Sequence, residues 1–69
     1  MDLSMAPLHQ LFNIKKIRGR DKIVKMLSNM GVQEGKDIMV ISESDGNLVI
    51  RVSETRLAIS KDLARKIII

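Results

Sequence analysis

The chain has 69 residues, enough for one small domain, and a core of that size rarely supplies more than about 3–5 kcal/mol of stability. Hydrophobic residues make up 45% and charged residues 29%, a balance typical of a folded globular domain and not of a disordered tail. Twelve Lys and Arg residues against eight Asp and Glu residues give a net charge of +4. We therefore expect one domain over residues 1–69, and its size favours a binding or regulatory module over an enzyme with a deep cleft.

The sequence carries no signal for an oxidising compartment or a membrane. It has no cysteine, which excludes disulfides and cysteine-ligated metals and fits a reducing compartment. Residues 1–4 lack the basic start and the apolar stretch of a signal peptide, and no apolar run is long enough to span a bilayer. We expect a cytoplasmic protein with no transmembrane segment of its own.

The opening segment contains the only proline of the chain. Pro7 fixes its own φ and favours an extended or turn conformation at Ala6. Apolar and polar residues then alternate from residue 11 to residue 17, as in a half-buried strand. Ile17 breaks this alternation, and we expect a bulge there.

Residues 21–30 have the period of a helix. Four apolar residues fall at i, i+3, i+4 and i+7 and so share the face that we expect to point inward: Ile23, Met26, Leu27 and Met30. Asp21 is the expected N-cap, and Gly31 stands where a helix ends through a left-handed residue.

Beyond Gly35, which we expect in a loop, the sequence predicts strands. The apolar run 38–41 is short enough for a buried strand, and Asp45–Gly46 predicts the tip of a hairpin that pairs it with residues 48–52. A further strand is expected at 56–59, then one helical turn capped by Ser60, then a short strand at 66–69. About five short strands with one helix after the first predict a mainly β fold, a small SH3-like barrel, with an OB-like barrel as the second choice.

No residues predict catalysis or metal binding. His9 is the only histidine, and no serine stands beside it to form a nucleophile–base pair. A metal site needs three or four converging ligands, and the acidic residues are scattered. Met26 and Met30 lie one helical turn apart but belong to the apolar face, so we assign them to core packing. We expect no catalytic, cofactor-binding or metal-ligating residue.

Positive charge is concentrated at the start of the predicted helix. Three of the four net charges fall within residues 1–35, and four residues are the candidates for partner binding: Arg18, Arg20, Lys22 and Lys25. Such a cluster can meet phosphates, an anionic membrane or an acidic protein face. Two alternatives are a solvated face that only keeps the domain soluble, and an apolar contact around Leu8, Leu11 and Val32. Nucleic acid is disfavoured because the only aromatic residue, Phe12, is expected in the core.

Several motifs in order resemble the ferrous iron transport protein A (FeoA) family. Residues 27–35 are similar to the family's passage from helix to strand, with a leucine, a glycine, an apolar residue and a second glycine. Residues 46–52 and 53–68 are similar to the short glycine–asparagine hairpin and the R-x-A-I … A-x-K-I ending of clostridial-type members. Residues 3–7 and 14–19 match the opening strand, so the resemblance runs from Leu3 to Ile69.

The resemblance implies an SH3-like barrel, which agrees with the fold predicted from the residues. Four residues have structural roles at turns on the evidence of their local sequence: Gly31, Gly35, Asp45 and Gly46. It also implies a cytosolic, non-enzymatic accessory protein of bacterial ferrous iron uptake. Its partner would be the membrane transporter whose cytoplasmic part is a G-protein domain (FeoB type). Fe²⁺ is implied only by this family association, because the family motifs assign no metal ligand to a residue of this chain. The alternatives are a free-standing regulatory module related to iron-dependent repressors, a basic nucleic-acid-binding module and an unrelated structural subunit.

Overall fold

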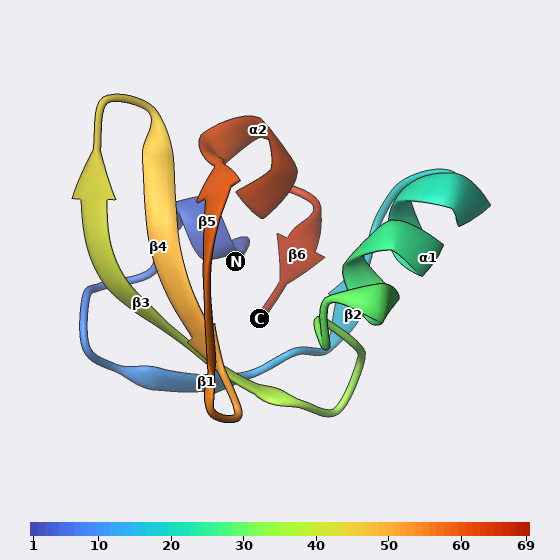
Figure 1. Ribbon diagram of the computed structural model, residues 1–69, viewed down its shortest axis with the longest axis horizontal. Helices are drawn as coiled ribbons and strands as arrows, with labels where there is room; N and C mark the ends of the chain where they lie inside the picture. The colour runs from blue at the N-terminus through green and yellow to red at the C-terminus, as the bar shows by residue number, and fades with distance from the viewer.

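Six strands and two helices form the computed structural model, which describes residues 1–69 (Figure 1). After one turn of 3-10 helix at Leu3–Met5, the elements follow in this order: β1 (Leu11–Asn13), β2 (Lys16–Ile17), α1 (Asp21–Asn29), β3 (Asp37–Ser44), β4 (Asn47–Val52), β5 (Thr55–Ser60), α2 (Lys61–Ala64) and β6 (Ile67–Ile68). This mainly β architecture with one main helix confirms the predicted fold class. The helix follows the second strand, however, and the strands number six.

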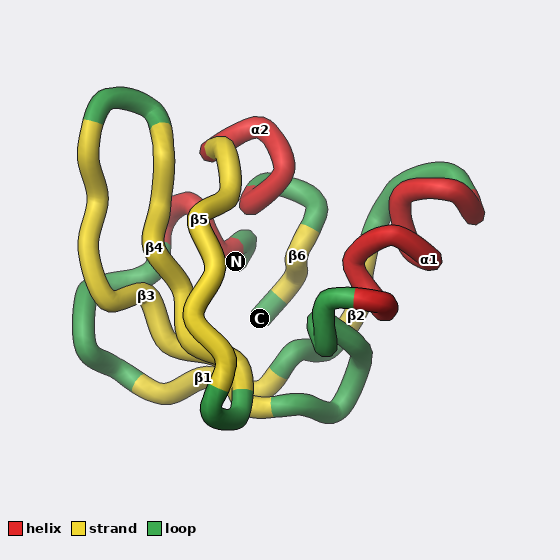
Figure 2. Tube along the Cα trace, viewed as in Figure 1, coloured by secondary structure: helices red, strands yellow, loops and turns green.

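Two antiparallel sheets enclose the core. The larger has the strand order β1-β3-β4-β5, and β2 pairs with β6 in the smaller. The larger sheet lies on one side and α1 on the other, with both chain termini between them (Figure 2). Ile69 donates its backbone N–H to the carbonyl of Met1 at 2.9 Å, so the last residue is tied to the first.

The core is entirely hydrophobic. Alternate residues of β4, namely Leu48, Ile50 and Val52, are at most 2% exposed, while Val49 and Arg51 point to the other face of the sheet. Val32, between α1 and β3, is fully buried with them. Phe12, which was expected in the core, is half-buried and packs against the core from outside.

The hairpin between β3 and β4 confirms the Asp45–Gly46 prediction. The two loop residues have φ values of +44° and +82°, and the primed turn that joins antiparallel strands requires positive φ at both positions. The register shifts between Val40 and Ser42, which leaves Ile41 as a bulge within the apolar run.

The predicted strand over residues 11–17 is split between the two sheets. Ile14 donates its backbone N–H to the carbonyl of Lys36, and Lys15 donates its own to the carbonyl of Ile68. The chain therefore leaves one sheet and joins the other at this corner. The bulge expected at Ile17 does not form, because Ile17 pairs in register with Ile67.

Helix α1 ends as its sequence predicts but begins one residue earlier. Gly31 has a φ of +87°, Val32 N–H donates to the carbonyl of Leu27 and Gly31 N–H to that of Ser28, the two bonds of a Schellman motif. The N-cap is Arg20 and not Asp21, which is the first helical residue.

The predicted inward face of α1 needs one correction. Leu27 is fully buried and Ile23 and Met30 are half-buried, but Met26 is 41% exposed. At 100° per residue, Met26 falls at the margin of a stripe centred on Leu27. Val24, at the opposite margin, is half-buried.

Candidate functional site

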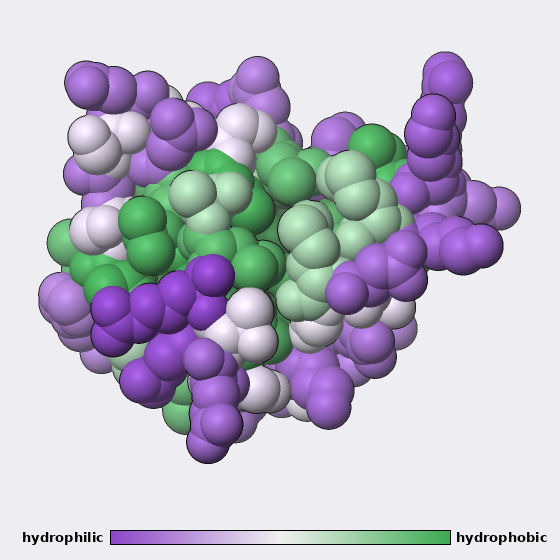
Figure 3. Space-filling model, viewed as in Figure 1, coloured by the Kyte–Doolittle hydropathy of each residue, from purple (hydrophilic) through white to green (hydrophobic).

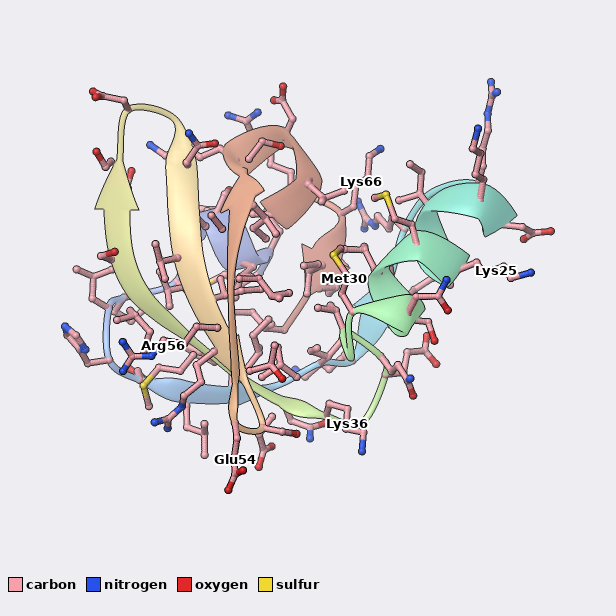
Figure 4. The ribbon with its side chains drawn as sticks, in the orientation of Figure 1. Lys25, Met30, Lys36, Glu54, Arg56 and Lys66 are labelled. Carbon is pink, nitrogen blue, oxygen red and sulfur yellow. The ribbon has the colours of Figure 1, made fainter.

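The four basic residues predicted to bind a partner lie close together along the chain at the start of α1. Arg18 follows β2, Arg20 caps α1, and Lys22 and Lys25 stand one turn apart on the helix. All four side chains are exposed, and none forms an ion pair, because the two ion pairs of the structure are Lys61–Glu43 and Arg65–Asp62. Figure 4 shows Lys25 projecting away from the body of the molecule.

A fifth cation, Lys66, joins this group through the pairing of β2 with β6. Arg18 donates its backbone N–H to the carbonyl of Lys66 at 2.7 Å, which continues that pairing. A Cβ atom placed on Gly19 would lie 3.7 Å from Cδ of Lys66, so the aliphatic stem of Lys66 runs beside Gly19. We refer to Arg18, Arg20, Lys22, Lys25 and Lys66 as the basic surface.

Few acidic residues accompany the cations of the basic surface. Asp21 is the one acidic residue in its chain segment, and it is exposed in the first turn of α1, where a carboxylate is favoured by the helix dipole. Hydrophilic side chains gather around this end of α1, while apolar side chains lie between α1 and the larger sheet (Figure 3). The surface can therefore attract an anionic partner by the summed field of its charges.

A pocket of about 380 Å³ borders α1. Its lining comes from Ile17 on β2, from Val24 and Ser28 on α1, and from the segment after the helix, Val32–Glu34. Gln33 closes part of the rim, because its Nε2 donates to the carbonyl of Ser28 at 3.2 Å. Half of the lining residues are apolar and half are polar.

The alternative apolar contact is not assembled in the structure. Val32 is fully buried, whereas Leu8 and Leu11 are 46% and 55% exposed. The pocket that includes Val32 has neither leucine in its lining. These three residues do not form one groove.

No catalytic or metal-binding constellation accompanies these surfaces. No three His, Asp or Glu side chains gather closely enough to hold a metal ion. His9 is exposed, has a φ of +62° and donates its backbone N–H to the carbonyl of Val40. Its role in the fold is therefore that of a turn residue. This donor set does not fit a metal centre.

Sequence reasoning missed Lys66 and a second basic pair, Arg51 and Arg56. Lys66 could not be assigned because its position depends on a strand pairing that joins residues 16–17 to 67–68. The position of Arg51 opposite Arg56, by contrast, could have been predicted from the sequence. The two-residue connection Ser53–Glu54 fixes the register of the hairpin and places Arg51 directly opposite Arg56.

Neither helix has the length and hydropathy that crossing a bilayer requires. A search of curated protein sequences finds no match. The family model described as "FeoA domain" matches residues 1–69.

Three solved structures are similar over nearly the whole chain. An iron uptake regulatory protein (FeoA) is 32% identical, with a TM-score of 0.86, over 96% of this chain and 88% of that one. FeoA from Stenotrophomonas maltophilia, an SH3 domain protein complexed with zinc, is 23% identical, with a TM-score of 0.85, over 99% and 87%. A FeoA-like protein from Clostridium acetobutylicum is 17% identical, with a TM-score of 0.85, over 97% and 80%. The predicted SH3-like fold is thereby confirmed.

Proposed function

Because the chain belongs to the FeoA family, a family of non-enzymatic accessory proteins, we propose that it serves bacterial ferrous iron uptake by binding the membrane transporter. The partner surface is the cytoplasmic part of a FeoB-type transporter, which contains a G-protein domain. The chain would then work in the cytoplasm, at the inner face of the membrane. The observation that carries this proposal is the family match over residues 1–69.

Two relatives support a role in iron uptake. The protein from Stenotrophomonas maltophilia is described as a candidate activating factor for bacterial ferrous iron transport, and the 32% identical protein as an iron uptake regulatory protein.

The basic surface is the contact region that we propose. The four cations at the start of α1 are exposed and Lys66 is half-buried, and none of the five forms an ion pair. A carboxylate-rich partner face can therefore approach without breaking an existing ion pair. An exposed charge pair contributes about 0–1 kcal/mol, so the five cations must act together. Charges at the rim of an interface mainly accelerate association.

Nucleic acid is a weaker candidate partner for the same surface. Proteins that bind single strands stack bases on aromatic side chains. The only aromatic residue, Phe12, packs against the core and lies on β1, away from α1 in sequence.

A retention experiment tests the proposed function. The full chain is immobilised, detergent-solubilised membranes from the source cells are passed over it at low salt, and retained proteins are identified by mass spectrometry. We expect a GTP-binding ferrous iron transporter to be retained. A matched column carries Lys22→Glu with Lys25→Glu and should retain less of it. Equal retention on a column of unrelated basic protein would contradict the proposal.

A further inference from the structure

Strand β5 is a free edge of the larger sheet. It follows β4 at the end of the strand order and pairs with no other strand (Figure 1). Lys61 donates its backbone N–H to the carbonyl of Gly46, so these two residues form a hydrogen-bonded pair. Hydrogen-bonded and non-hydrogen-bonded pairs alternate along an antiparallel ladder, which makes every second residue of β5 a non-hydrogen-bonded one. The backbone groups of Arg56 and Ala58 therefore point away from β4. None of the hydrogen bonds outside the ladders uses them.

This edge lacks the structural protections against a further strand, and Arg56 is its one charged residue. Edge strands are commonly kept short, bent by a bulge or interrupted by proline. Strand β5 has six residues, contains no proline, and pairs with β4 in one unbroken register. Arg56 and Ala58, whose backbone groups point away from β4, are both exposed.

Two arginines lie opposite each other on the outer face of the sheet, next to this edge. The register aligns one residue from each strand in a row: Leu11, Met39, Arg51 and Arg56. The ladder phase makes Arg51 and Arg56 a pair without mutual hydrogen bonds, in which Cα atoms are about 4.5 Å apart and side chains are closest. Both are exposed and neither has an ion-pair partner. Like charges placed in this way destabilise a sheet.

A strand added beside β5 would supply the missing partners. Its residue opposite Arg56 would extend the row to a fifth position, where a carboxylate can accept from the guanidinium groups. Its neighbours in sequence would point to the other face, beside the half-buried Leu57. Figure 4 shows Arg56 on the outer side of the sheet, while Glu54, at the hairpin end, points away from the molecule.

We propose that the β5 edge binds an extended segment of a partner protein as an additional strand, with an acidic residue opposite Arg56 and apolar residues facing Leu57. The backbone groups of Arg56 and Ala58 give such a segment its hydrogen bonds, and the arginine pair selects its charge. A second copy of this chain fits less well, because Thr55–Ser60 contains no acidic residue and would bring another Arg56. The inference does not require that the partner be the transporter.

Matched synthetic peptides test this site on the full chain. The probes are capped six-residue peptides of alternating pattern with a central Glu, the same peptide with Gln, and the Glu peptide with N-methylated backbone amides along one edge. Amide shifts of the isotope-labelled protein are followed by NMR. We expect the largest shifts at Arg56 and Ala58, and about three- to fivefold tighter binding of the Glu peptide than of the Gln peptide at low salt. The N-methylated peptide should not bind.

Two variants separate the arginine pair from general attraction. Arg56→Gln should remove the preference for Glu over Gln. Lys36→Gln, which removes an exposed and unpaired charge outside β4 and β5, should keep it. The proposal is overturned if the Glu and Gln peptides bind the unaltered protein equally or if none binds. It is also overturned if N-methylation has no effect, if the shifts lie on α1, or if β5 shifts with protein concentration alone, which would indicate a second copy.

Discussion

Gly31 is the residue on which the end of α1 depends. It adopts a φ of +87°, and a Cβ atom added there would meet nothing within 4 Å, so the requirement for glycine is conformational and not one of space. We expect Gly31→Val to lower the free energy of unfolding by more than about 1 kcal/mol, because a β-branched residue is strained at positive φ. Urea denaturation of the variant measures this change.

Gly31→Asn is the matched control, because asparagine tolerates the left-handed region and should cost less than valine. If the two variants unfold at the same urea concentration, the positive φ is not what makes glycine necessary.

Leu27 and Met26 are neighbours on α1 with different environments. Leu27 is fully buried and Met26 is 41% exposed. Leu27→Ala should cost about 2–5 kcal/mol, which is comparable to the whole stability of so small a domain, so much of this variant should be unfolded. Met26→Ala should change the stability by less than about 1 kcal/mol. Circular dichroism thermal melts of both variants compare the two, and similar losses would show that Met26 is part of the core.

At the scale of elements, α2 depends on its cap, because four residues are too few for a helix to form alone. Ser60 Oγ accepts from the backbone N–H of Leu63 at 3.1 Å. Ser60→Ala should destabilise the protein by about 1 kcal/mol, whereas Ser60→Asp, which keeps an acceptor, should be nearly neutral. Chemical denaturation distinguishes these outcomes, and equal losses for alanine and aspartate would exclude the capping role.

Elements with a local signal were predictable from the sequence. The Asp45–Gly46 hairpin, the glycine end of α1 and the Ser60 cap each depend on residues a few positions apart. The division of residues 11–17 into β1 and β2 was not predictable, because it results from backbone bonds of Ile14 and Lys15 to partners more than twenty residues away. A barrel corner leaves little trace in the alternation of apolar residues.

The residues of the candidate surfaces also differ in whether the local sequence predicts their place. Arg18 to Lys25 are adjacent in sequence, so their clustering could be predicted and the structure exposes them together. Lys66 reaches them through the β2–β6 pairing, which no local pattern indicates. The alternative groove around Leu8, Leu11 and Val32 does not form, because the end of α1 places Val32 in the core.

At the scale of the whole molecule, the net charge of +4 is distributed over separate regions. The basic surface lies at the start of α1, and the arginine pair lies on the outer face of the larger sheet. One chain can therefore present two basic contact regions, one of which attracts through its summed field and the other through a defined strand register.

The association rate of the chain with the detergent-solubilised transporter tests the central claim most directly. It should be measured at low and high salt for the unaltered chain, for Lys22→Glu with Lys25→Glu, and for a control with the same charge change at exposed sites without an ion-pair partner, Lys15→Glu with Lys36→Glu. We predict that the α1 variant stays folded and associates about tenfold more slowly at low salt, with the difference shrinking at high salt, while the control loses much less. Association that is unchanged by the α1 substitutions at both salt concentrations would contradict a functional contact through the basic surface.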